Sequence, residues 1–214
     1  MSIKNDLNCM EDLCRMDTMG MFEALKGLPA QCSRACWDLA RDVVLPEIEA
    51  ISNIVVTGLG GSAIGGDLLR VYTAGKLAVP VTVNRDYVLP EFVGPDTLVF
   101  AVSYSGNTEE TLSAYGEARS RGASVVAVST GGRLGELAGQ DGVPLIGVPG
   151  GISPRAATGF LFIPILRVLQ RLGLLPDTVD EISEMIDYIR GLQEKLAPEA
   201  PEEENLAKQL ARKL

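Results

Sequence analysis

The chain has 214 residues, of which 46% are hydrophobic, and its formal net charge is −9. This length fits one domain with an ample apolar core. The negative charge and the lack of a basic run argue against a nucleic-acid partner, because such proteins normally present a positive face to the phosphate backbone. The sequence shows no signal-peptide core and no apolar run near the ~20 residues of a membrane span, so we expect a cytoplasmic protein with no membrane partner.

The first predicted helices lie between residues 16 and 44 and are broken at Gly27-Leu28-Pro29. Their apolar stripe is typical of a helix packed on a core, and it consists of Cys32, Ala35, Leu39 and Val43. We therefore expect residues 1–45 to pack on the domain formed by residues 46–196.

The cysteines lie at positions 9, 14, 32 and 36, and the chain contains no histidine. A zinc site needs thiolates at suitable spacing and usually histidine as well, so we expect no metal and no other cofactor. Cys32 and Cys36 lie four residues apart in a helical pattern, which favours buried reduced thiols over a redox pair.

From Asn53 onward, short apolar strands alternate with helices. This alternation predicts right-handed βαβ units in an α/β fold, a three-layer α/β/α sandwich with a doubly wound, five-stranded parallel sheet. The predicted strands span residues 54–57, 79–83, 98–102, 124–128 and 144–148, and the predicted helices span residues 63–74, 109–121, 157–172 and 177–196.

Residues 197–214 read as an acidic linker followed by a terminal helix. The linker, 197–204, is rich in proline and glutamate. The helix, 205–214, places Leu206, Leu210 and Leu214 on one side. Because so short a helix is unstable alone, we expect it to dock somewhere on the protein.

A glycine loop, Gly58-Leu59-Gly60-Gly61-Ser62, joins the first strand to its helix. Ligands of parallel sheets bind at the carboxyl ends of the strands. Glycines allow close approach to the backbone, and helix N–H groups with the Ser62 hydroxyl suit an anion. Two alternatives stay open. The loop could only pack helix on strand, or it could hold a dinucleotide with Asp86 on the ribose.

A second loop of similar character follows the third predicted strand. It contains Ser103, Ser105, Gly106 and Thr108. One hydroxyl would suffice to cap the following helix, whereas three hydroxyls close together favour a phosphate site shared by side chains and backbone N–H groups. Helix capping alone is the alternative.

Four motifs in order resemble the sugar isomerase (SIS) domain, and more closely the bifunctional phosphoglucose/phosphomannose isomerases. The resemblance covers about residues 15–214 and implies a SIS domain with a flavodoxin-like fold. The motifs are Gly58-Leu59-Gly60-Gly61-Ser62-Ala63-Ile64-Gly65-Gly66-Asp67, Asn84-Arg85-Asp86-Tyr87-x-Leu89-Pro90, Ser103-Tyr104-Ser105-Gly106-Asn107-Thr108-Glu109-Glu110-Thr111 and Pro154-Arg155-Ala156-Ala157.

The resemblance also implies roles for individual residues. Arg155 would be catalytic, neutralising the negative charge of an enediolate as a proton moves between C2 and C1. Without the motif, Arg155 would be read as a member of a surface ion pair. Gly60 and Gly61 would let the sugar lie against the backbone. The phosphate would be held by four hydroxyl side chains, those of Ser62, Ser103, Ser105 and Thr108.

The family further implies a homodimer in carbohydrate metabolism that acts on fructose 6-phosphate, glucose 6-phosphate and mannose 6-phosphate. Its proton-transfer residues, a glutamate, a histidine and a lysine, lie in a second SIS half. Since this chain has no histidine, we expect it to be the substrate-binding N-terminal half, with residues 197–214 leading toward the second half. Two alternatives of other classes are a non-catalytic sugar-phosphate sensor and a nicotinamide-dependent oxidoreductase.

Overall fold

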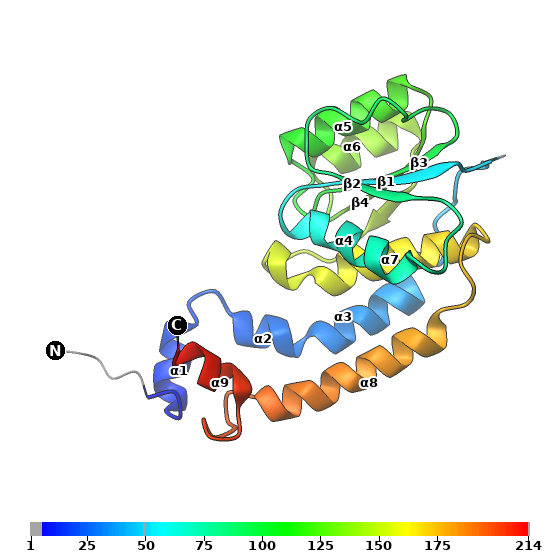
Figure 1. The fold of residues 1–214 in the computed structure, drawn as a ribbon. Helices are drawn as coiled ribbons and strands as arrows, with labels where there is room; N and C mark the ends of the chain where they lie inside the picture. The colour runs from blue at the N-terminus through cyan, green and yellow to red at the C-terminus, as the bar shows by residue number, and fades with distance from the viewer. Residues whose placement is uncertain (1–5, 49, 214) are drawn as a thin grey trace.

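The strands form one parallel sheet in a computed structural model that describes residues 6–48 and 50–213 (Figure 1). The sheet has five strands in the order β2-β1-β3-β4-β5, and every neighbouring pair is parallel. The predicted parallel sheet is therefore confirmed. The strands are β1 (Asn53–Thr57), β2 (Val81–Asn84), β3 (Thr97–Val102), β4 (Ser124–Ser129) and β5 (Leu145–Gly147).

Helices cover both faces of the sheet. α5 (Glu109–Ser120) and α6 (Gly132–Asp141) lie on one face, and α4 (Gly61–Thr73) and α7 (Thr158–Arg171) lie on the other (Figure 1). Successive strand residues enter opposite cores. Ile54 and Val56 pack toward α4 and α7, whereas Val55 packs toward α5. Burial on both faces explains why these strands are continuous apolar runs, and it confirms the predicted three-layer sandwich.

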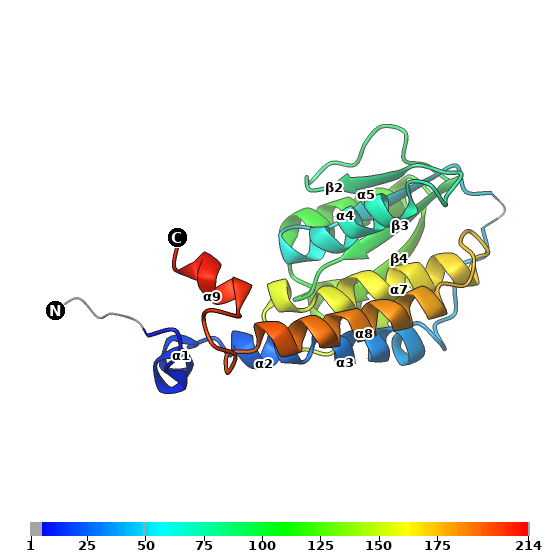
Figure 2. The same ribbon diagram turned by 60° about the horizontal axis from the view of Figure 1, so that its bottom comes forward.

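A further layer lies beneath α7. It contains α2 (Met21–Lys26), α3 (Leu28–Arg34) with its π-helical extension η1 (Ala35–Leu39), and α8 (Val179–Leu196). Figures 1 and 2 show α3 and α8 side by side, and α3 also contacts α7. The predicted break at Gly27 is present, but the helix ends at Leu39 rather than near Val44.

The two cysteines of this layer are buried in the same apolar cluster as the strands. Cys32 is 3% exposed and Cys36 is 4% exposed, and both are free thiols. Burial raises the pKa of Cys32 to about 11 and also raises the pKa of Cys36. Neither group therefore ionises readily near neutral pH, which agrees with the interpretation as inert core thiols.

Two helices of the structure were not predicted, α1 (Met10–Met16) and α6. In α6 the glycines at 132, 135 and 139 lower the intrinsic helix propensity. Only Leu134 and Ala138 are buried, and they face the sheet. Packing of these two side chains outweighs the local preference for a loop.

The terminal helix α9 (Leu206–Ala211) is attached by its polar side rather than by its leucines. Leu206 is 60% exposed and Leu210 is 53% exposed, while Leu214 lies outside the described residues. Lys208 is buried instead, and its Nζ donates to the Ala200 carbonyl at 2.7 Å. Asn205 caps the helix through the amides of residues 207 and 208. Polar groups of residues 197–205 thus supply the hydrogen-bond partners that hold this helix in place.

None of the described helices is long and apolar enough to cross a bilayer.

A polar cluster joins the end of α4 to the start of α8. The Tyr72 hydroxyl and the Lys76 ammonium each donate to Glu181 Oε2 at 2.6 Å, and Lys76 Nζ lies 3.9 Å from the centre of the Tyr72 ring. The hydrogen bonds from Lys76 and Tyr72 hold the pKa of Glu181 below its ordinary value. The cluster therefore stabilises the fold above the ordinary glutamate pKa of about 4.3, and this stabilisation is lost as the pH falls below that value.

Replacing Glu181 with glutamine should lower the thermal unfolding midpoint at pH 7 and have a smaller effect at pH 3, because the charge-based stabilisation by the wild-type carboxylate is lost progressively as the pH falls. Unfolding monitored by circular dichroism at both pH values measures the difference. Glu184→Gln, an exposed change on the same helix, serves as the control and should shift the midpoint little at either pH. An equal loss at pH 3 and pH 7 for Glu181→Gln would contradict the charge-based account.

Candidate functional site

The first loop runs from β1 into α4 and contacts two other loops closely. Gly60 has φ +55°, a conformation that favours glycine. A Cβ on Gly58 would lie 2.8 Å from the Val102 carbonyl oxygen, and a Cβ on Gly61 would lie 2.7 Å from the Pro154 carbonyl oxygen. Gly58 and Gly61 thus serve close packing, which is the role that the first alternative gave to this loop. The same packing brings the loop beside the end of β3 and the segment that carries Arg155.

Ser62 joins the first loop to the second. Its side chain is 5% exposed, and its Oγ accepts a hydrogen bond from the Tyr104 backbone N–H at 3.1 Å. The hydroxyl hydrogen is not used in that bond. The two loops predicted from sequence are therefore one connected structure at the carboxyl edge of the sheet.

The second loop, between β3 and α5, is organised around a buried hydroxyl. Ser103 Oγ lies 2.9 Å from Thr108 Oγ1 and accepts the Gly106 N–H at 3.1 Å. Ser105 is exposed, and its Oγ accepts the Asn107 N–H at 3.2 Å. Ser103 thus fixes the shape of the loop, while Ser105 lies at its surface.

Thr108 occupies the N-cap position of α5, yet its side chain makes no capping hydrogen bond. Within the described residues, the amides of Glu109, Glu110 and Thr111 have no acceptor. Capping alone therefore does not explain the hydroxyl-rich loop. Free amides in the first turn of a helix, beside two accessible hydroxyls, form an arrangement that can bind an anion.

Arg155 lies in η2 (Pro154–Ala156), a short 3₁₀ turn that precedes α7. Its side chain is exposed and makes no hydrogen bond or ion pair with any described residue, so the reading as a surface ion pair is not supported. The turn itself is held firmly. Buried Gln31 donates from Nε2 to the Ala156 carbonyl at 3.0 Å, and Gly61 packs against Pro154.

A loop that sequence reasoning missed supports the second loop from behind. It follows β4 and leads into α6. The Arg133 N–H donates to Asn107 Oδ1 at 3.0 Å, and the Leu134 N–H donates to the Gly106 carbonyl at 2.8 Å. The signal was present, since Thr130-Gly131-Gly132 is another glycine-rich segment directly after a strand.

The motif after β2 forms the rim of this edge. Asp86 Oδ1 accepts the N–H of Tyr87 at 2.7 Å and so closes a local turn, while Arg85 pairs with Asp67 on α4. Both side chains therefore have local partners. Neither contact indicates a binding site for the ribose of a dinucleotide.

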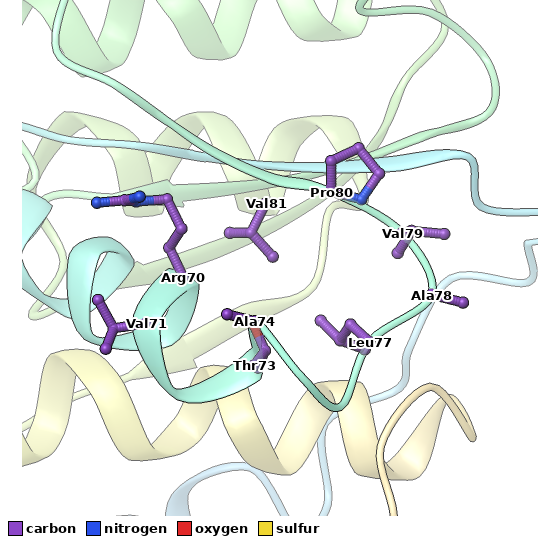
Figure 3. A pocket seen from close by; sticks show the side chains of 9 residues that line it. All are labelled: Arg70, Val71, Thr73, Ala74, Leu77, Ala78, Val79, Pro80 and Val81. Atoms are coloured by element: carbon purple, nitrogen blue, oxygen red, sulfur yellow. The ribbon is translucent and has the colours of Figure 1, made fainter.

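A hollow at the opposite edge of the sheet lies away from these loops (Figure 3). It is formed by the end of α4, the turn that follows and the start of β2. Apart from Arg70 and Thr73 its lining is apolar, and the Thr73 hydroxyl donates within its own helix to the Leu69 carbonyl at 2.7 Å. This lining does not suit a phosphorylated sugar. The candidate site is therefore the carboxyl edge.

No protein-family model matches the chain, but curated proteins and solved structures resemble it. The bifunctional phosphoglucose/phosphomannose isomerase of Caldicellulosiruptor bescii is 50% identical over 195 residues, which are 91% of this chain and 57% of that protein. The enzyme of the same name from Thermoplasma acidophilum is 51% identical over 120 residues, which are 56% of this chain and 36% of that protein.

The solved structure of tagatose-6-phosphate ketose/aldose isomerase from Escherichia coli matches the fold with a TM-score of 0.59 at 17% identity, over 83% of this chain and 54% of that one. The sheet and its loops thus have the SIS-type α/β fold of these solved structures. By its sequence, the chain belongs to the family of bifunctional phosphoglucose/phosphomannose isomerases, and the resemblance seen in the sequence is confirmed. The part of the chain that matches the Caldicellulosiruptor relative spans 57% of that protein's length.

Proposed function

We propose that this chain is the substrate-binding part of a sugar-phosphate isomerase that interconverts glucose 6-phosphate or mannose 6-phosphate with fructose 6-phosphate. The observation that carries the proposal is the guanidinium of Arg155, which has no partner among the described residues. The backbone of its turn packs against Gly61 in the first loop, and Ser62 joins that loop to the second loop with its hydroxyls and free helix amides. A small ligand that carries a phosphate and develops a second negative charge during the reaction could bind the loop through its phosphate and Arg155 through the developing charge.

In this proposal the phosphate group lies at the start of α5. Its oxygens accept hydrogen bonds from the hydroxyls of Ser105 and Thr108 and from the first-turn amides. Ser62 contributes the hydroxyl hydrogen that its bond to Tyr104 leaves free. Ser103 was predicted to hold the phosphate as well. Because its hydroxyl is fully buried and already bonded within the loop, its contribution is to keep Thr108 in place.

The sugar then extends from the phosphate over Gly60 and Gly61 toward Arg155. Transfer of a proton between C2 and C1 passes through an enediolate, whose charge a fixed guanidinium stabilises as it develops. Isomerisation also needs a base and a group that opens the sugar ring. The loops supply no histidine or lysine, and Glu109 and Glu110 lie on the first turn of α5. We infer that the chain alone binds hexose 6-phosphates without isomerising them.

The second candidate function is that of a non-catalytic sugar-phosphate sensor. The 50% identity with a named isomerase favours the isomerase function over it. A cytoplasmic homodimer is part of the same proposal and rests on the family resemblance. Residues 197–214 are proposed to lead toward the partner half of the complete enzyme.

Replacing Ser105 with alanine tests the proposed phosphate site. A hydrogen bond to a charged group contributes about 1.5–3 kcal/mol, so the dissociation constant of fructose 6-phosphate should rise by about ten- to a hundredfold. Isothermal titration calorimetry measures the change. Ser113→Ala, the same substitution at an exposed position of α5, should leave the affinity unchanged.

Two further measurements address the class of function. Fructose 6-phosphate at a hundred times its dissociation constant should raise the free energy of unfolding by about 2.7 kcal/mol, whereas NADH should not stabilise the chain. A coupled assay should detect no turnover. Stabilisation by NADH instead of the sugar phosphate would overturn the proposed function, and turnover at the rate of a full-length relative would overturn the proposed lack of catalysis.

A further inference from the structure

Tyr104 lies between buried Ser103 and exposed Ser105 in the second loop, and its own side chain points into the core. It is 7% exposed and belongs to the apolar cluster on the α4/α7 side of the sheet. Buried tyrosines place their ring in an apolar environment and find a partner for the hydroxyl. Here the hydroxyl reaches the segment between β5 and Arg155.

The Tyr104 hydroxyl makes two hydrogen bonds with that segment. It donates to the Pro149 carbonyl at 3.0 Å and accepts the N–H of Ile152 at 3.3 Å. Because both its donor and its acceptor capacity are used, the orientation of the hydroxyl is fixed. Within the described part of the chain, these are the only hydrogen bonds that tie residues 149–152 to another segment.

The segment needs such a tie because it has little structure of its own. It reads Pro149-Gly150-Gly151-Ile152, and Gly151 has φ +94°. Glycine pairs have high conformational freedom, which must be restricted if the following turn is to hold Arg155 in one place. The Tyr104 hydroxyl restricts the segment immediately upstream of that turn.

Tyr104 also contacts the first loop, since its backbone N–H donates to Ser62 Oγ at 3.1 Å. One residue therefore touches all three segments of the candidate site: it is part of the second loop, it bonds to the first, and it holds the third. We propose that Tyr104 is a positioning residue that couples the phosphate-binding loop to Arg155 and sets the distance between the two ends of the ligand. This inference rests on the proposed function.

The test compares two ligands that differ at the end remote from the phosphate. 6-Phosphogluconate carries a carboxylate at C1, whereas glucitol 6-phosphate carries a neutral alcohol there. The selectivity is the ratio of their dissociation constants, measured by calorimetry on the full chain. A charge-assisted contact with Arg155 should favour 6-phosphogluconate by about tenfold or more.

Tyr104→Phe removes only the hydroxyl. It should reduce this selectivity by about fivefold or more and change the affinity for glucitol 6-phosphate by less than about twofold, because the phosphate contacts remain. In an Arg155→Ala background, where the selectivity is already lost, Tyr104→Phe should have no further effect on it. Such non-additivity is the signature of a residue that acts through another.

Tyr115→Phe is the matched control. Tyr115 is also buried, and its hydroxyl donates to Asp141 at 2.8 Å on the other face of the sheet. Its loss should leave both affinities unchanged. Hydrogen exchange supplies a readout without ligand, since Tyr104→Phe should accelerate exchange of the Ile152 amide and Tyr115→Phe should not.

An equal loss of affinity for both ligands in Tyr104→Phe, an unchanged selectivity, or an unchanged rate of exchange at Ile152 would overturn the proposed coupling. Failure of the wild-type chain to bind either ligand would instead overturn the proposed function, and this inference with it. The two failures are distinguished by the wild-type titration.

Discussion

Replacing Gly106 with alanine is expected to lower the free energy of unfolding by about 3 kcal/mol or more and to abolish binding of fructose 6-phosphate. Gly106 has φ +73°, which costs a residue with a side chain about 1–2 kcal/mol. An added Cβ would also lie 1.9 Å from the Gly131 carbonyl oxygen, so the second loop must separate from the loop behind it. Urea denaturation and calorimetric titration measure the two effects.

Gly142→Ala separates the two causes of this loss. Gly142 has a similar φ, +66°, but a Cβ there meets nothing within 4 Å. It should therefore show only the backbone strain of about 1–2 kcal/mol and should retain ligand binding. If Gly106→Ala costs no more than Gly142→Ala, the close contact between the two loops is not what shapes the site.

Support from a neighbouring loop is the kind of feature that sequence reasoning did not find. The strands were predictable because runs such as Ile54-Val55-Val56 are buried on both faces and so remain apolar throughout. The two loops were predictable because hydroxyls and glycines gather where such strands end. The loop after β4 has the same character, but its helix is poor in apolar residues and rich in glycine, so neither was recognised.

Individual roles within the site depend on long-range contacts, which the linear pattern does not encode. Ser103 and Ser105 are two residues apart and look equivalent in the sequence, yet Ser103 is fully buried and Ser105 is exposed. Ser103 directly follows β3 and bonds within the loop, whereas Ser105 lies farther out at the loop surface. Gln31 supports the turn of Arg155 from a position 125 residues away. No local motif would indicate that contact.

The terminal helix shows that a local pattern does not reveal which side of a helix is attached. Leu206 and Leu210 lie on one side, but both are exposed. The burial of Lys208 is possible because its ammonium finds the Ala200 carbonyl. A buried charge with a hydrogen-bond partner is tolerated where an unpartnered one is not, and the partner became visible only in the structure.

The relative placement of Arg155 and the first loop depends on the packing of α4 against α7. Gly65 lies at this contact, where a Cβ would be 2.5 Å from the Leu161 carbonyl oxygen and 3.0 Å from the Leu161 carbonyl carbon. Both are backbone atoms of α7, so no side chain can rotate away. Gly65→Ala should therefore push the helices apart. Overpacking costs about 1–3 kcal/mol, of which the better helix propensity of alanine recovers up to about 1 kcal/mol.

The net expectation is a loss of up to about 2 kcal/mol in unfolding free energy once the full gain in helix propensity is subtracted. Binding of 6-phosphogluconate should weaken more than binding of glucitol 6-phosphate, because α4 begins with the first loop and α7 directly follows Arg155. Gly191→Ala provides the matched control, since it is the same change within a helix with nothing within 4 Å. It should raise stability by up to about 1 kcal/mol. Opposite signs for the two substitutions, measured by urea denaturation, would show that the contact between helices decides the outcome. Equal gains in stability would mean that α4 and α7 can separate freely, and the fixed distance between Arg155 and the phosphate loop would then have no structural basis.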